Sequence, residues 1–300
     1  MNAHDDIRIG TLVPAHDRTP QVIEQLLPHG FETFQLSFGR TVGDFDLAGL
    51  AERIHRVLET HGMADDQPRR ISGLGVYGNP LTSPETIRDW ERLIDAAGLF
   101  GCDLVAGFAG RIPSRPVPES YPRFAEVFGP LARRAEDHGL RLAFENCEKR
   151  GTWEDGDWNI AHAPQAWEAM FASVESPVLG LEWEPCHQLM SFVDPLPQLR
   201  QFAHRIWHIH GKDATILWDV VKSHGIRGGV PYAHHRLPGF GDTNWTDLVS
   251  SLRLCGWRGS IDIEGFHDPV YRDRLELTGQ VAALEYLKRC RGGEFIANVW

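Results

Sequence analysis

The stretch Ile206-Trp207-His208-Ile209-His210-Gly211-Lys212-Asp213 decides the fold that the sequence predicts. Its apolar and polar residues alternate as in a β-strand until Gly211 ends the pattern. Because residues two apart on a strand point to the same face, His208 and His210 share one face. A histidine at the carboxyl end of a strand can bind a metal, act as an acid or base, or be a buried residue bonded to a carbonyl. The rest of the chain decides among these three readings.

Short strand-like runs alternate with longer helical patterns along the whole chain. The predicted strands cover residues 7–13, 33–38, 71–77, 103–108, 141–145, 178–184, 206–210 and 260–264. Helices are predicted over residues 19–29, 47–61, 121–138, 164–174, 196–204, 245–255 and 275–289, and Ser83-Pro84-Glu85 opens one more. This series predicts an α/β fold, a closed (β/α)8 TIM barrel, with a doubly wound open sheet as the alternative. No linker divides the chain, so residues 1–300 are predicted to form a single domain.

The composition argues against several classes of partner. The formal net charge is −11 and no block of lysine or arginine stands out, which disfavours nucleic acid and anionic membranes as partners. The polar residues 1–6 predict no signal peptide, and no apolar run approaches the roughly 20 residues of a membrane helix. Five widely spaced cysteines without a C-x-x-C pair favour free thiols and a cytoplasmic location.

The last four predicted strands each end in a glutamate or a histidine. These residues are Glu145, Glu184, His210 and Glu264, and the carboxyl ends of barrel strands meet at one rim. Three carboxylates brought together repel one another, and a divalent cation between them removes that conflict. Any one of these residues alone would be interpreted as a solvated side chain at the end of a strand. Four such residues at the same rim of the barrel favour a metal site. Oxygen ligands with one imidazole favour Mn²⁺, with Mg²⁺, Co²⁺ and Zn²⁺ as alternatives.

A second polar layer precedes these strand ends. Glu182, His208 and Asp262 each lie two residues before a predicted ligand, so they are expected to face the barrel interior one layer deeper. Such layers are normally filled by Val, Ile and Leu, and polar residues there would orient the ligands. A β-bulge would reverse the alternation of inward and outward side chains, and these three residues would then face the helices instead.

Five motifs from this half of the chain resemble the xylose isomerase-like barrels, a superfamily that includes ketose 3-epimerases and sugar-phosphate isomerases and epimerases. They are Phe144-Glu145-Asn146, Glu184-Pro185-Cys186-His187, His210-Gly211-Lys212-Asp213, Pro238-Gly239-Phe240-Gly241-Asp242 and Ile263-Glu264. The resemblance covers most of the chain and is tightest over residues 141–268. In that superfamily the metal is held by Glu, Asp, His and Glu, so Glu184 departs from the usual Asp and is the least regular ligand.

The resemblance also implies roles for individual residues. The glutamates that match Glu145 and Glu264 act as acid and base on opposite faces of the substrate in the epimerases. His187 matches a histidine that contacts substrate hydroxyls, and Lys212 and Asp213 match the motif behind the ligand histidine and are expected to face the substrate. These roles suit the removal of a proton next to a carbonyl through an enediolate that a metal stabilises.

Two long loops are expected to form the rim of the site, over residues 148–163 and 214–244. Trp153 and Trp158 in the first loop, with Trp183, could stack on a sugar ring or serve as ordinary packing. His234-His235 in the second loop could close over the substrate or simply be exposed. Cys147 and Cys186 are interpreted as packing residues, because no Cys–His base arrangement is evident.

The sequence therefore favours a metal-dependent isomerase or epimerase of a small carbohydrate or keto-sugar. The alternative is a lyase or dehydratase that eliminates a group from a keto-sugar or a 3-keto-glycoside. A non-catalytic sugar-binding barrel and a nuclease of the endonuclease IV type are two further alternatives with less support. The apolar end, residues 295–300, is expected to pack on the barrel or on a neighbouring subunit, which leaves a homo-oligomer open.

Overall fold

A computed structural model describes residues 4–64 and 67–299. Eight strands close a barrel in the order β1, β12, β9, β8, β7, β6, β5, β2. Their bounds are β1 (Ile7–Pro14), β2 (Thr33–Ser37), β5 (Arg70–Val76), β6 (Leu104–Gly107), β7 (Arg141–Glu145), β8 (Leu179–Trp183), β9 (Ile206–Gly211) and β12 (Gly259–Ile263). The predicted TIM barrel is confirmed as a single-domain fold, and each predicted strand agrees with an observed one to within about two residues.

The residues fall into two compact units by their internal contacts. The carboxyl-terminal unit comprises residues 1–11, 184–204 and 209–300, and the amino-terminal unit comprises residues 12–183 and 205–208. The boundary cuts β1 and β9, so each of these strands contributes residues to both units.

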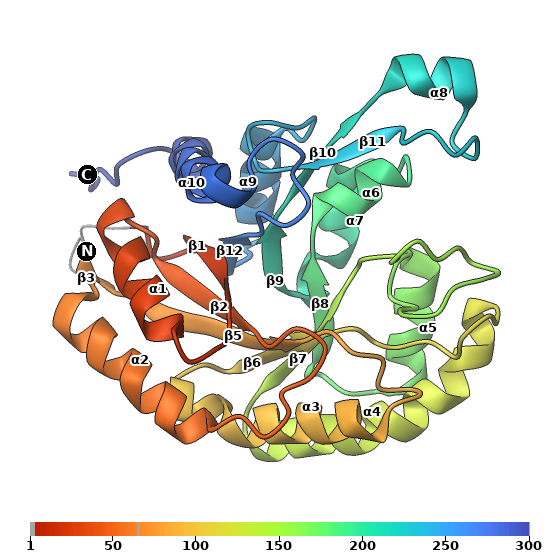
Figure 1. The fold of residues 1–300 in the computed structure, drawn as a ribbon, viewed down its shortest axis with the longest axis horizontal. Coiled ribbons are helices and arrows are strands. Elements are labelled where there is room, and N and C mark those ends of the chain that lie inside the picture. The colour runs from red at the N-terminus through yellow and green to blue at the C-terminus, as the bar shows by residue number, and fades with distance from the viewer. Residues whose placement is uncertain (1–3, 65–66, 300) are drawn as a thin grey trace. The chain divides into compact units, whose positions relative to one another are not determined.

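The amino-terminal unit is a run of parallel strands covered by helices on the outside (Figure 1). The helices are α1 (Thr19–Leu26), α2 (Leu47–His61), α3 (Pro84–Ala96), α4 (Tyr121–Asp137) and α5 (Pro164–Ser173). As predicted, Ser83 caps α3 by accepting the Thr86 N–H through its hydroxyl, and Pro84 starts the helix. Between strands and helices, Phe124, Phe128 and Phe144 pack with ring centroids 4.8 to 5.4 Å apart.

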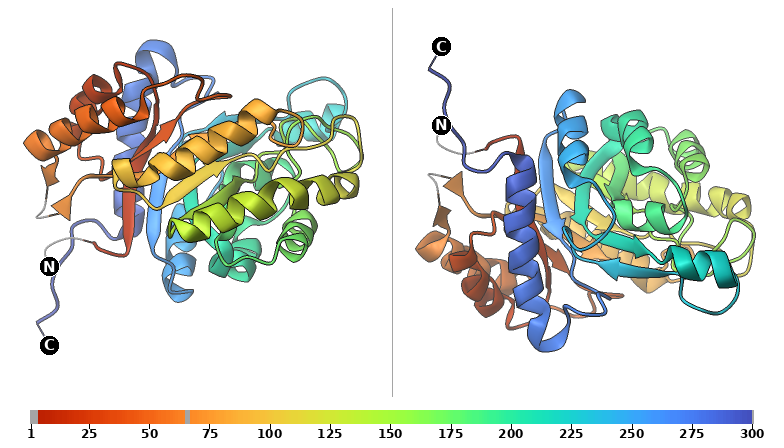
Figure 2. Two further views of the ribbon diagram at one scale, coloured as in Figure 1. Left: turned by 90° about the horizontal axis from the view of Figure 1, so that it is seen from below. Right: turned by 90° about the horizontal axis from the view of Figure 1, so that it is seen from above.

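The carboxyl-terminal unit combines barrel strands with a β-hairpin. Its helices are α6 (Pro185–Met190), α7 (Pro195–Phe202), α8 (Trp218–His224), α9 (Trp245–Leu254) and α10 (Glu276–Arg291). β10 (Asp213–Ile216) pairs antiparallel with β11 (Ala233–Arg236), and α8 lies at the far end of this hairpin (Figure 1). Seen from above, α10 runs beside β12, with α9 next to it (Figure 2).

The stretch from residue 214 to 244 differs from the prediction of a long loop. It contains α8 and most of the hairpin, with Thr215 opposite His234 and Ala214 opposite His235. The sequence does not predict the hairpin because the last three of the four residues of β11 are polar, so the strand lacks the alternation of apolar and polar residues. The other predicted long loop, residues 148–163, contains no helix or strand.

The first and last described segments of the chain contact each other. The imidazole of His4 meets the ring of Phe295 edge-on at 5.7 Å between centroids. Beyond it, Ile296 and Val299 are 87% and 90% exposed, so these two side chains do not pack on the barrel, and Trp300 lies outside the described residues. Within residues 4–64 and 67–299, no helix is both long enough and apolar enough to cross a membrane.

Candidate active and metal site

Three of the four predicted metal ligands come together in the carboxyl-terminal unit. Glu184, His210 and Glu264 each offer a ligand atom, and these atoms lie within 4.8 Å of one another. Glu184 follows β8 directly, and Glu264 follows β12, where its N–H donates to the Gly211 carbonyl at 3.2 Å. Parallel pairing of β12 with β9 sets His210 opposite Asp262. The strand ends thus bring these side chains to one place, as the sequence predicts.

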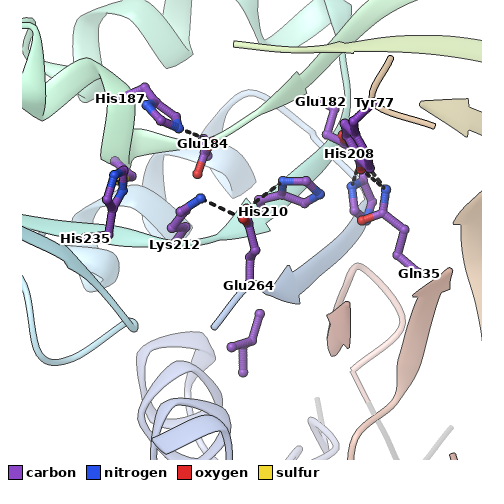
Figure 3. A network of polar contacts seen from close by, with 12 residues as sticks. Gln35, Tyr77, Glu182, Glu184, His187, His208, His210, Lys212, His235 and Glu264 are labelled. Carbon is purple, nitrogen blue, oxygen red and sulfur yellow. Dashed lines mark hydrogen bonds and ion pairs between the residues drawn. The ribbon is translucent and has the colours of Figure 1, made fainter. Parts of the chain in front are cut away.

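Ion pairs link this cluster to two further side chains (Figure 3). The Lys212 ammonium lies 2.6 Å from Glu264 Oε1, and Nδ1 of His210 lies 3.2 Å from Glu264 Oε2. His187 Nε2 lies 2.9 Å from Glu184 Oε1. All five side chains are at most 8% exposed, so water screens the interactions among them only weakly.

Both carboxyl groups are held ionised in spite of their burial. Burial would raise the pKa of Glu264, but Lys212 and His210 hold that pKa well below its usual range. Burial likewise opposes the charge of Glu184, whose pKa is nevertheless lowered by Lys212 and His187 while Glu264 acts to raise it. Two buried carboxylates therefore share one ammonium. Two carboxylate groups and an imidazole so close together are a donor set that fits a divalent cation such as Mn²⁺.

Glu145, the fourth predicted ligand, is the last residue of β7 in the amino-terminal unit and is 6% exposed. Its carbonyl and that of Cys147 both accept hydrogen bonds from the Asn159 amide, each at 2.8 Å. The Asn159 side-chain oxygen in turn accepts the Ala109 N–H at 3.1 Å. The loop over residues 148–163 thus fixes the strand end that carries Glu145.

The predicted inner layer is buried, and in the amino-terminal unit it forms a hydrogen-bonded network (Figure 3). Glu182 Oε1 lies 3.2 Å from His208 Nδ1 and also accepts from the Gln35 amide, while the Tyr77 hydroxyl donates to Oε2 at 3.0 Å. Gln35 and Tyr77 were not foreseen. The position of Gln35 between Phe34 and Leu36 on β2 was the available signal. Asp262 is fully buried in the other unit.

Asp213 does not occupy the substrate-facing position that was expected. Its Oδ1 accepts from the N–H groups of Ala214 and Thr243 at 2.8 and 3.1 Å and from the Thr243 hydroxyl at 2.6 Å. Its Oδ2 accepts from the indole N–H of Trp245 at 3.0 Å. Burial raises the pKa of Asp213, and these hydrogen bonds act in the opposite direction. The side chain therefore anchors β10 to the start of α9.

The predicted stacking tryptophans lie in different surroundings. Trp183 in β8 is completely buried. Trp153 is partly buried, and its carbonyl accepts hydrogen bonds from Val117 N at 2.9 Å and from the Arg111 guanidinium at 3.3 Å. These hydrogen bonds explain how the loop over residues 148–163 keeps its shape.

β11 brings His235 into the cluster, which no spacing in the sequence indicates. Its ring lies 5.6 Å from that of His187, and its Nδ1 lies 3.2 Å from the Cys186 sulfur. Cys186, which the sequence analysis interprets as a packing residue, is completely buried and also contacts this histidine. Burial, with Lys212 and His187 nearby, lowers the pKa of His235 to about 4, so its imidazole is neutral near neutral pH.

Comparisons with known proteins agree with this fold. Residues 23–290 match the family described as a xylose isomerase-like TIM barrel. An inosose dehydratase of Clostridium beijerinckii is 23% identical over 177 residues, or 58% of this chain and 56% of that protein. A rhizopine catabolism protein of Rhizobium meliloti is 25% identical over 50% of this chain and 44% of its own. The chain thus spans about half the length of these curated relatives.

Among solved structures, 3-keto-D-glucoside 4-epimerase from E. coli has a TM-score of 0.69 at 14% identity, over 95% of this chain and all of that one. At identities this low, the likeness is one of fold.

Proposed function

Because the chain belongs to the xylose isomerase-like TIM barrel family, we propose that it is a divalent-metal-dependent isomerase or epimerase of a small carbohydrate. The observation that carries this proposal is the buried cluster of Glu184, His210 and Glu264, with Lys212 paired to Glu264. Buried carboxylates crowded in this way are costly for stability, and catalysis is a common reason to keep them.

In this proposal Glu184, His210 and Glu264 hold one metal ion, and Glu145 is the fourth ligand. Mn²⁺ is the preferred ion because three carboxylates and one imidazole form an oxygen-rich set. When bound, a divalent cation would polarise a carbonyl and stabilise negative charge on its oxygen. Glu184 is a ligand in spite of its departure from the usual Asp, since its carboxylate lies within 4.8 Å of the ligand atoms of His210 and Glu264.

Glu264 and Glu145 carry the proton in the proposed reaction. One carboxylate removes the proton from the carbon next to a carbonyl, and the other returns a proton to the same or the neighbouring carbon. The Lys212 ammonium keeps the Glu264 carboxylate ionised, and a base must be ionised to accept a proton. When the Glu264 carboxylate removes the substrate proton, the ammonium donates a hydrogen bond to a substrate oxygen. His187 contacts a substrate hydroxyl. Glu182, His208 and Asp262, one layer deeper in the barrel, orient the ligands at the strand ends.

A dehydratase or lyase is the second candidate, and the similarity to an inosose dehydratase favours it. The first step would be the same removal of a proton. The electron pair left on carbon then forms a double bond and expels a hydroxyl or alkoxyl group from the next carbon, and that group leaves with a proton from the second carboxylate. The substrate would be a keto-sugar or a 3-keto-glycoside.

The surroundings of the site are part of the proposal. The loop over residues 148–163 and the hairpin of β10 and β11 would each contribute to the rim, with Trp153 and Trp183 near the sugar. We also propose a cytoplasmic location, since none of the five cysteines forms a disulfide.

One experiment separates these functions. Mn²⁺-loaded protein is incubated with keto-sugars and 3-keto-glycosides in heavy water, and the products are followed by NMR. An isomeric sugar with deuterium at one carbon supports the isomerase or epimerase. An unsaturated sugar with a released alcohol or water supports the lyase. If Mn²⁺ binds but no substrate in the panel exchanges or changes, the proposal of a catalyst is refuted in favour of a sugar-binding protein.

A further inference from the structure

A group of soft donor atoms lies beside the oxygen-rich cluster, within the carboxyl-terminal unit. The Cys186 sulfur is 3.2 Å from Nδ1 of His235 and 4.0 Å from the thioether sulfur of Met190. A ligand atom of His187 lies within 4.8 Å of the Cys186 sulfur. The proposed carbohydrate chemistry uses none of the first three side chains.

The local fold explains why these donors converge. Cys186 and Met190 are four residues apart on α6, so both sulfur atoms lie on the same face of the helix. That face meets β11, which carries His235. Cys186 is fully buried, whereas Met190 and His235 beside it are partly exposed.

The spacing of the donors suits a four-coordinate metal. With bonds of about 2.3 Å to sulfur and 2.0–2.1 Å to nitrogen, tetrahedral geometry separates a sulfur and a nitrogen donor by roughly 3.6 Å and two sulfur donors by roughly 3.8 Å. The distances of 3.2 and 4.0 Å are each within about half an ångström of these values. Thiolate, thioether and imidazole together select thiophilic cations, whereas Mn²⁺ and Mg²⁺ prefer carboxylates.

We propose that Cys186, Met190 and His235 form a second cation site, specific for thiophilic ions such as Cu⁺ and Cd²⁺, with His187 as the fourth donor. The thiol gives up its proton to solvent as the sulfur binds the ion. Occupation draws His187 away from Glu184, its partner at 2.9 Å. If the proposed function holds, the ion therefore inhibits the enzyme without displacing Mn²⁺.

The test is a Cd²⁺ titration of protein that already holds Mn²⁺, followed by the ultraviolet charge-transfer band of a cadmium–thiolate bond and by calorimetry. We expect one tight Cd²⁺ per chain, with Mn²⁺ retained by elemental analysis. Cys186→Ser abolishes the band, and Met190→Leu and His235→Gln each weaken binding by about tenfold or more. Cys255→Ser, which removes the exposed thiol, leaves both band and affinity unchanged.

A band that survives Cys186→Ser, or that disappears in Cys255→Ser, would overturn the proposal, because the ion would then sit on another thiol. Release of Mn²⁺ in proportion to Cd²⁺ would also overturn it, since the two ions would share one site. Circular dichroism of Cys186→Ser shows whether the variant is folded, and His235→Gln provides the same test without changing the thiol. None of these measurements needs a substrate, so they test the second cation site even if the proposed reaction is wrong.

Discussion

Nζ of Lys212 lies 2.6 Å from Oε1 of Glu264, and both side chains are almost completely buried. The ammonium thus compensates a carboxylate that would otherwise be charged away from water. Lys212→Met should destabilise the metal-free protein by about 3 kcal/mol, because an unpaired buried charge is costly. Saturating Mn²⁺ should restore most of that loss by taking the place of the ammonium. Urea unfolding with and without Mn²⁺ measures both effects, and Lys222→Met on the exposed face of α8 is the control. An equal loss with and without Mn²⁺ would contradict this account.

Asp213 is an anchor, so its removal should affect stability. Asp213→Ala leaves buried donors of Thr243 and Trp245 without an acceptor, which should cost about 3 kcal/mol of the free energy of unfolding. Asp219→Ala on α8, where the side chain is exposed, should change it by less than about 0.5 kcal/mol. Denaturant unfolding of the two variants compares them. If Asp213→Ala keeps full stability but loses much of its substrate affinity, the residue binds the substrate and is not an anchor.

The network around Glu182 should behave as one unit. Tyr77→Phe removes one donor and should cost about 1 kcal/mol, and Glu182→Gln should cost more because it also weakens the contacts with His208 and Gln35. In a double-mutant cycle the two changes should couple by about 0.5 kcal/mol or more, since the residues share a hydrogen bond. Strictly additive free energies would show that the hydroxyl contributes nothing to the network.

Asp268 should make the free energy of unfolding depend on pH in the acid range. Burial would raise its pKa, but the N–H groups of Tyr271 and Val270 and the guanidinium of Arg236 lower it below the ordinary 3.8. A carboxyl group whose pKa is depressed in the folded state stabilises the protein above its unfolded pKa, and loses that effect as the pH falls through the folded value. Asp268→Asn should therefore be less stable than the native protein by about 1–3 kcal/mol at neutral pH.

The difference between these two proteins should shrink as the pH falls from the ordinary pKa of 3.8 through the lower pKa of the folded state. Urea midpoints across the acid range measure it. A constant difference at every pH would mean that the amide disrupts packing and that the charge of Asp268 is unimportant.

The strands of the barrel could be predicted because they follow from local patterns, and the same patterns predict which side chains meet at the strand ends. Strand ends of one direction meet at one edge, so residues as distant as Glu184 and Glu264 were expected together from the chain alone. The hairpin of β10 and β11 could not be predicted, because its polar strand is stabilised by pairing with a neighbour and carries no apolar alternation.

The same limit applies to single residues. The contact of Cys186 with His235 spans 49 positions of sequence and depends on that hairpin. Asp213 was assigned to the substrate by its motif, yet its acceptors are filled by Thr243 and Trp245, whose proximity only the fold creates. Tyr77 lies just past the end of β5, where no strand pattern fixes the direction of a side chain.

The most direct test of the central claim is the rate at which solvent deuterium enters the carbon next to the carbonyl of a bound keto-sugar. Mn²⁺-loaded native protein should exchange this proton, and removal of the metal by a chelator should slow the exchange by about 1,000-fold or more. Glu264→Gln should slow it to a similar degree while the variant still unfolds cooperatively. Exchange that persists without metal, or that Glu264→Gln leaves at the native rate, would contradict the account.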